Sequence, residues 1–299
     1  MRTKFIKQLI EEARHDKRIF LVVGDLGYHV VEPFAETFPE RFLNVGIAEQ
    51  NMTGIAAGLA MSGYNVYTYS IGNFPTLRCI EQIRNDVAYH HANVKIVAVG
   101  AGYSYAGLGA THQATEDIGA MRSIPNMVVA TPGDPIEAEA VTRISAHYEG
   151  PMYIRLGRAG EKIVHDDIPQ KIEIGDVLPL KVNGNSTAVI ACGAILDKAR
   201  QSIENKNLAY DLYSVPFVKP INKMQLKQIV ETHDAGLVIM EEHQKSCGAG
   251  SAIVECLSDM YSSGEISVYP KVRRLAINDE FLPIVGSQDY LRNVAGLTL

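Results

Sequence analysis

Hydrophobic positions follow two patterns that alternate along the chain. Short continuous apolar runs, rich in β-branched residues, have the length and composition of buried parallel strands; they lie at 19–23, 65–70, 94–99, 127–131 and 152–156. Between them, apolar residues recur at helical spacing over 52–59, 77–90, 116–122 and 136–148. This alternation predicts an α/β fold with a doubly wound, mainly parallel sheet.

The pattern is interrupted once. Residues 166–184 are polar and irregular, which predicts a linker between a first domain at 1–165 and a second at 185–299. In the second domain, strand patterns return at 187–191, 209–215, 237–241 and 272–277, with helical segments at 195–204, 248–257 and 288–294. We therefore expect two consecutive α/β domains.

Composition narrows the class of protein. The 299 residues are 46% hydrophobic and carry a net charge of −6. The sequence has no stripe of basic residues, so there is no indication of nucleic-acid binding. The four cysteines lack metal-binding or disulfide-framework spacing, which favours reduced thiols and a cytoplasmic location. The first 18 residues are typical of an amphipathic helix, and no apolar run reaches membrane-spanning length.

One acidic residue stands at a strand-to-helix junction. Arg41 to Val45 has the pattern of a short strand, Gly46 interrupts it, and a helical face follows from Met52, so Glu49 falls at the helix entrance. Ligands collect at the carboxyl ends of parallel strands, which makes Glu49 a candidate functional carboxylate. An acid in a first helical turn also complements the helix dipole. The spacing alone leaves both interpretations open.

The segment NVGIAEQNM at 44–52, followed by Gly54 and Gly58, resembles the pyrimidine-binding domain of transketolases and deoxyxylulose-phosphate synthases. This resemblance implies thiamine diphosphate as cofactor. In that family the matching glutamate hydrogen-bonds a ring nitrogen of the aminopyrimidine and promotes loss of the thiazolium proton, which implies a catalytic and cofactor-binding role for Glu49. The second half of the chain resembles the transketolase C-terminal domain in pattern.

Three further residues resemble the family's cofactor pocket. Phe74 stands where relatives place an aromatic against the aminopyrimidine, although packing in the core is the default role of a phenylalanine. Gln82 takes a position where many transketolases carry a second aromatic, which implies a more polar pocket. Asp25 follows the first strand and is expected to border the cofactor, or to serve as a turn residue.

Four residues are candidates for contact with substrate. His112, in Thr111-His112-Gln113, resembles a histidine that approaches the reacting centre, and a histidine shuttles protons near neutral pH. Arg158 matches an arginine that binds the sugar phosphate in relatives, and Arg78 is a second candidate by likeness to the synthase branch. His29 stands in the first loop where relatives use serine. The alternative for each arginine is a solvated surface charge, and for His112 a surface or capping residue.

Other positions depart from the family pattern. Relatives carry a phosphate-binding histidine where this chain has Gly100, and an aspartate where it has Leu108. These departures predict an unusual sugar or small aldehyde as acceptor.

The diphosphate half of the cofactor site is missing from the sequence. Relatives bind Mg²⁺ through a Gly-Asp-Gly motif, and the Gly-Asp steps at 24–25, 133–134 and 175–176 all lack the third glycine. No metal site is therefore expected in this chain. The resemblance implies the C-terminal subunit of a split transketolase, with Mg²⁺ held by a partner that carries the diphosphate-binding domain, and an α2β2 assembly.

The implied reaction is transfer of a two-carbon ketol unit from a ketose, free or phosphorylated, to an aldose or aldehyde. The alternatives are a deoxyxylulose-phosphate-synthase-like carboligase that uses pyruvate, the β subunit of a 2-oxoacid dehydrogenase, and a noncatalytic subunit.

Overall fold

A seven-stranded sheet forms the core of the first domain. The computed structural model describes residues 1–166 and 172–299. The strand order is β10-β5-β6-β4-β3-β1-β2, and all neighbours are parallel except β10 and β5. The bounds are β1 Ile19–Val23, β2 Phe42–Asn44, β3 Asn65–Ile71, β4 Val94–Val99, β5 Val128–Ala130, β6 Met152–Leu156 and β10 Phe217–Lys219.

Helices cover both faces of this sheet, because successive strand residues point to opposite sides. One apolar core lies beneath α1 (Arg2–His15), α2 (Glu32–Thr37) and α6 (Pro135–His147), and includes Phe5, Val97 and Ile154. The core on the other face lies beneath α3 (Glu49–Met61) and α5 (Asp117–Ser123), and includes Met52 and Ile96. The two faces make the doubly wound arrangement that the sequence predicted.

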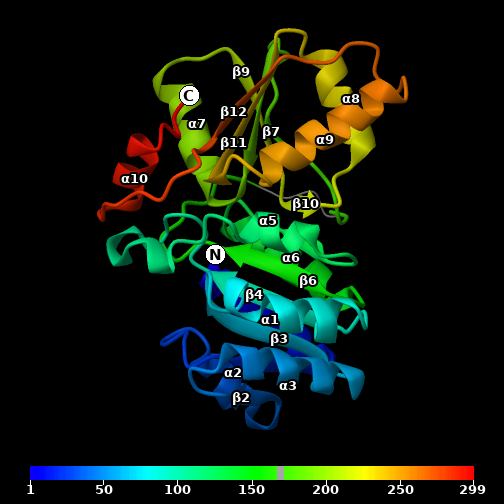
Figure 1. Cartoon of the computed structure of the whole chain (residues 1–299), viewed down its shortest axis with the longest axis vertical. Helices are drawn as coiled ribbons and strands as arrows, with labels where there is room; N and C mark the ends of the chain where they lie inside the picture. Colours follow the sequence, from blue (N-terminus) through cyan, green and yellow to red (C-terminus); the bar gives the residue numbers. More distant parts are fainter. Residues whose placement is uncertain (167–171) are drawn as a thin grey trace.

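The second domain contains a five-stranded sheet in the order β12-β11-β8-β9-β7, antiparallel only between β7 and β9. Its helices also cover both faces (Figure 1). The bounds are β7 Leu178–Lys181, β8 Thr187–Cys192, β9 Tyr210–Ser214, β11 Gly236–Gln244, β12 Val272–Ile277, α7 Leu196–Asn205, α8 Lys223–Thr232, α9 Ala249–Ser262 and α10 Gln288–Val294. Two consecutive α/β domains are thus confirmed.

Some elements differ from the sequence-based expectation. The helix predicted at 77–90 is divided into a 3-10 turn Leu77–Cys79, the short α4 Ile80–Gln82 and a π-helix Ile83–Ala88. Helices α2 and α8 and the short strand β10 were not predicted. Strand β7 lies inside the predicted linker 166–184, of which residues 167–171 fall outside the described part.

The chain crosses between the domains after β9. It places β10 against β5 of the first sheet, before returning to form α8 (Figure 1). Phe217 of β10 is fully buried in the core beneath α1 and α6. In the described residues, no helix combines the length and the apolar character needed to cross a membrane.

Candidate active site

Glu49 is the first residue of α3 and its side chain is 1% exposed. Its Oε2 accepts a hydrogen bond from Nη1 of Arg78 at 2.7 Å, whereas its buried Oε1 has no hydrogen-bond partner among the described residues. The carboxylate lies beside the end of β1, since a Cβ on Gly24 would come within 3.4 Å of Glu49 Cγ and 3.5 Å of Ser70 Oγ. A buried carboxylate oxygen without a donor is costly, which points to a missing ligand.

Arg78 connects Glu49 to an aromatic group. Its guanidinium carbon lies 4.7 Å from the ring centroid of Phe74. The ring of His112 meets the Phe74 ring edge-on, with 5.3 Å between centroids. The structure therefore brings four predicted site residues, Glu49, Arg78, Phe74 and His112, into one continuous series of contacts.

The loop that carries His112 approaches the ends of two strands. A Cβ on Gly72, which follows β3, would lie 3.2 Å from Ala114 Cβ and within 4 Å of the carbonyl oxygens of His112 and Gly100. Gly100, which follows β4, has φ of +101°. A Cβ there would overlap with the Tyr105 ring, so Tyr105 fills the space that a side chain at position 100 would need.

Arg158 reaches the same loop from the end of β6. Its guanidinium carbon lies 5.3 Å from the ring centroid of Tyr105, and its side chain is exposed. Burial raises the pKa of Tyr105, and the positive charges of Arg2 and Arg158 only partly oppose this shift. Tyr105 therefore stays a neutral phenol near pH 7.

A buried ionic network fixes the end of this loop. Arg155 donates to both carboxylate oxygens of Asp117, at 2.7 and 3.1 Å, and the Tyr153 hydroxyl donates to the same carboxylate at 2.5 Å. Burial alone would raise the pKa of Asp117, but the charges of Arg155 and His243 and the hydrogen bonds from Arg155 and Tyr153 together outweigh it, so the pKa is lowered. Arg155 also donates to the carbonyls of Ala114 and Glu242, which ties the loop to the second domain.

Glu242 extends this connection. Its side chain accepts hydrogen bonds from the backbone N–H of Tyr103 at 2.6 Å, from Gln288 and from Arg292 at 2.6 Å. Sequence reasoning missed Arg155 and Glu242. The available signal was the presence of charged residues inside strands that are otherwise apolar and buried, because such charges require partners.

Three predicted residues, Asp25, His29 and Gln82, have no hydrogen bond or ring contact with Glu49, Arg78, Phe74 or His112 in the described part of the chain. Asp25 has φ of +54°, and its carboxylate accepts a hydrogen bond from Asn44 at 2.9 Å. It lines a cavity of about 380 Å³ next to the edge strand β2. His29 is exposed, and its backbone N–H donates to Glu32 at 2.8 Å. The buried Oε1 of Gln82 in α4 has no partner among the described residues.

The described residues contain one cluster with the composition of a metal site, which consists of Asp134, Glu137 and His165. The Glu137 oxygens face the N–H of Gly133 at 2.6 Å and Nε2 of His165 at 2.6 Å. The Asp134 oxygens accept hydrogen bonds from the backbone N–H groups of Ile136, Glu137, Val164 and His165. Every carboxylate oxygen is thus engaged, and the cluster fastens residues 164–165 to the start of α6.

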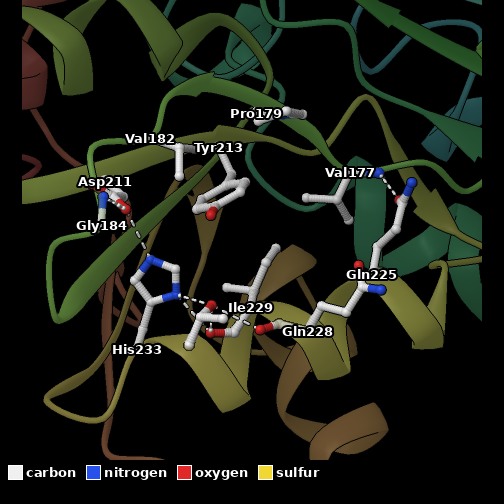
Figure 2. A pocket seen from close by; sticks show the side chains of 11 residues that line it. Val177, Pro179, Val182, Gly184, Asp211, Tyr213, Gln225, Gln228, Ile229 and His233 are labelled. Carbon is white, nitrogen blue, oxygen red and sulfur yellow. Dashed lines mark hydrogen bonds and ion pairs between the residues drawn. The ribbon is translucent and has the colours of Figure 1, made fainter.

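A cavity of about 600 Å³ lies in the second domain, between β7, β9 and α8 (Figure 2). Figure 2 shows Tyr213 and Ile229 on its walls and the pair Asp211–His233 at one end, with 3.2 Å between Oδ2 and Nε2. Asp211 also accepts hydrogen bonds from the turn at 183–185. The walls of this cavity belong to the second domain, whereas Glu49 and its contacts lie in the first.

The chain is similar to two families of known protein domains. Residues 1–160 match the transketolase pyrimidine-binding domain, and residues 176–298 match the transketolase C-terminal domain. A protein from Methanocaldococcus jannaschii, described as a transketolase C-terminal section, is 36% identical over 286 residues, which cover 94% of this chain and 87% of the relative.

Two other similarities involve subunits of split enzymes. One of the subunits of the apulose-4-phosphate transketolase of Phocaeicola vulgatus is 32% identical over 262 residues, which cover 86% of this chain and 83% of the relative. A solved structure described as a split gene transketolase, inactive beta4 tetramer, is 34% identical with a TM-score of 0.84, and the match covers 99% of this chain and 92% of that one.

Proposed function

Because this chain belongs to the transketolase family and corresponds to the C-terminal subunit of a split transketolase, we propose that it transfers a two-carbon ketol unit from a ketose to an aldose or aldehyde. The family resemblance identified from residues 44–52 is confirmed by these matches. The observation that carries the proposed mechanism is the buried Glu49 carboxylate with one oxygen left without a donor.

The transketolase family depends on thiamine diphosphate, and the residues of the first domain fit the pyrimidine end of this cofactor. When bound, the cofactor supplies the electron sink for carbon–carbon bond cleavage and formation. Glu49 Oε1 is free to exchange a proton with a ring nitrogen, and Phe74 offers an aromatic face. Gln82, with a free buried oxygen, and Asp25, at the end of β1, are proposed to border the same ring.

Substrate is proposed to bind on the side of His112 and Arg158. His112 is held beside Phe74 and near the end of β3, from where it can donate or accept a proton at a substrate hydroxyl. Arg158 is exposed and suited to an anionic group, with Arg78 as a second cation and His29 contributing from the first loop.

The departure at Gly100 bears on which substrate is used. Tyr105 occupies the space beside Gly100, and Arg158 lies over the Tyr105 ring. We therefore propose that the pair Tyr105–Arg158 recognises the anionic or polar end of the substrate, in place of a histidine at position 100. This arrangement supports an acceptor that differs from an ordinary pentose phosphate.

The diphosphate and Mg²⁺ are proposed to be held by a partner subunit. In the described residues, the one acidic cluster of suitable composition has all its oxygens engaged in hydrogen bonds. A relative that is one subunit of a transketolase supports a partner chain carrying the N-terminal transketolase domain, and a solved relative described as an inactive beta4 tetramer supports self-association of this chain. The assembly proposed for the active enzyme is α2β2. The free state of all four cysteines supports a reducing compartment such as the cytoplasm.

The test is a transfer assay on the complex of this chain with its partner subunit, with a panel of ketose donors and aldehyde acceptors. We expect products two carbons longer than the acceptor. Glu49→Gln should lower the rate by at least about 100-fold without changing assembly, because its amide cannot exchange the proton. The control is Glu81→Gln, an exposed carboxylate on α4, which should keep full rate.

Two outcomes would contradict the proposal. Carbon dioxide release from pyruvate, in place of ketol transfer, would indicate the carboligase alternative. Full activity of Glu49→Gln would remove the proposed role of that carboxylate.

A further inference from the structure

Arg78 is held by two groups that the proposed function assigns to the cofactor. Its Nη1 donates to Glu49 Oε2 at 2.7 Å, and its guanidinium lies over the Phe74 ring at 4.7 Å. We infer that Arg78 occupies the place of the aminopyrimidine in the cofactor-free chain, and that the cofactor must displace it in order to bind. This inference rests on the proposed function and adds a step to it.

The chemistry of the guanidinium supports this interpretation. It is planar, carries N–H donors in its plane, and stacks on aromatic rings. An aminopyrimidine bound between Glu49 and Phe74 would make the same two contacts as the guanidinium. These are a hydrogen bond to the carboxylate in the plane of the group and a stacking contact with the ring. Arg78 uses Oε2 of Glu49, and the proposed cofactor contact uses Oε1, so the two groups compete at the Phe74 ring. Two planar groups cannot stack on the same ring face together, so binding of one excludes the other.

Burial explains why such a substitute is useful. Glu49 is almost completely buried, and a buried carboxylate with no opposite charge beside it is strongly destabilised. Arg78 provides that charge before the partner subunit supplies the cofactor. Its own side chain is 46% exposed, so it can leave without opening the core.

The local structure leaves Arg78 free to move. Among the described residues, its side chain has one hydrogen bond, to Glu49, and one ring contact, to Phe74. It lies in the 3-10 turn Leu77–Cys79, which is followed by a short α-helix and a π-helix instead of one rigid helix. Once displaced, the guanidinium is available to an anionic group of the substrate, which is the role that the likeness to the synthase branch implies for it.

Competition of this kind lowers the apparent affinity for the cofactor. The apparent dissociation constant equals the intrinsic constant divided by the fraction of molecules in which the site is open. Removal of the guanidinium should therefore tighten binding. Because the arginine of this ion pair is 46% exposed, water weakens its attraction for Glu49, and we expect a change of about fivefold, which corresponds to about 1 kcal/mol.

The experiment is calorimetric titration of thiamine diphosphate with Mg²⁺ into the complex of this chain with its partner subunit. Arg78→Gln should bind about fivefold more tightly than the wild type, and Arg78→Lys, which keeps the charge but not the planar group, should fall between them. The matched control is Arg84→Gln, an exposed arginine of the π-helix that is hydrogen-bonded to Asn85, which should bind as the wild type does.

The outcomes separate the inference from the function on which it rests. Equal or weaker binding by Arg78→Gln would overturn the inference and leave the proposed function standing, whereas no binding by any complex, wild type included, would overturn both. A structure of the cofactor-loaded wild-type complex gives a readout independent of the variants. Arg78 should there be out of hydrogen-bonding distance of Glu49, and an unchanged ion pair would refute displacement.

Discussion

At the scale of single residues, the loop that carries His112 depends on the buried ion pair between Arg155 and Asp117. Replacement of Arg155 by methionine should destabilise the chain by about 3–5 kcal/mol, because it leaves the Asp117 carboxylate buried without its counter-charge. The free energy of unfolding, measured in urea, checks this value. Arg158→Met is the control and should change that free energy by less than about 0.5 kcal/mol, as expected for an exposed side chain. A loss below about 1 kcal/mol for Arg155→Met would show that the network does not hold the loop.

The sequence directed attention to Arg158, whereas the structure shows a larger structural role for Arg155. Arg155 is buried in β6 and donates to Asp117 and to two backbone carbonyls, while Arg158 is exposed. Both residues lie in or next to the same predicted strand. Their roles differ because Arg155 faces the interior of the protein from within β6, whereas Arg158 follows the end of β6 and faces solvent.

For Glu49, the sequence identified the residue but not its environment. A carboxylate between a strand, a glycine and an apolar helical face could be placed at the start of α3, because each of these signals is local. The ion pair with Arg78 joins residues 29 positions apart and depends on how the 77–88 segment packs against α3. Such a contact follows from tertiary packing, which hydrophobic spacing does not describe.

At the scale of elements, the parallel strands were the most predictable part. The bounds of β1, β4 and β6 agree with the predicted runs, because a strand buried on both faces is apolar at nearly every position. The bounds of β12 also agree, although this edge strand carries Arg273 and Arg274 and is buried only in its second half. The antiparallel edge strands β7 and β10 are short and pair with segments that are distant in the sequence. The hydrophobic pattern of neighbouring residues therefore does not predict them. The periodicity at 77–90 indicated a helix but could not distinguish an α-helix from a π-helix.

The segment after β6 is fastened by His165, and this contact should depend on pH. Burial alone would lower the pKa of His165, but the hydrogen bond with Glu137 and the negative charges of Glu137, Asp134 and Asp166 together outweigh it, so its pKa is raised above the ordinary value. The folded state then holds the proton more tightly than the unfolded state. The resulting stabilisation is fully present below about pH 6.5 and is lost as pH rises through the raised pKa.

Amide hydrogen exchange at Val164 and His165 measures this effect, since both N–H groups donate to Asp134 beside the histidine. Corrected for the intrinsic rate, their protection should fall as pH rises above about 6.5. His165→Gln should lose this pH dependence. The control is His147→Gln, because the His147 side chain is 75% exposed, and it should retain the wild-type profile. The same pH profile in His165→Gln would exclude the histidine as its cause.

At the scale of the whole molecule, the two domains are connected by a common strand, hydrogen bonds and core contacts, and not only by a linker. Strand β10 leaves the second domain to complete the first sheet, and Arg155 bonds to the carbonyl of Glu242 in β11. The core on the α3 side also includes Ala249 and Ala252 of α9. Loss of either domain would therefore expose apolar surface of the other, which predicts cooperative unfolding.

Phe217→Ala tests this coupling, because the Phe217 ring is fully buried in the first domain although its chain segment follows β9. Truncation should cost about 3–5 kcal/mol. Urea titration followed by hydrogen exchange and mass spectrometry reports on β4 and β8 separately. In the wild type, β4 and β8 should lose protection at the same urea concentration. In Phe217→Ala they should lose it at two different concentrations, because the contact that couples the two sheets is weakened. Phe281→Ala, at a side chain that is 68% exposed, should leave both midpoints unchanged.

A single unfolding transition in Phe217→Ala would show that the Phe217 contact does not couple the two sheets. The coupling would then be assigned to the hydrogen bond between Arg155 and the Glu242 carbonyl, and Arg155→Met should show two transitions in the same measurement.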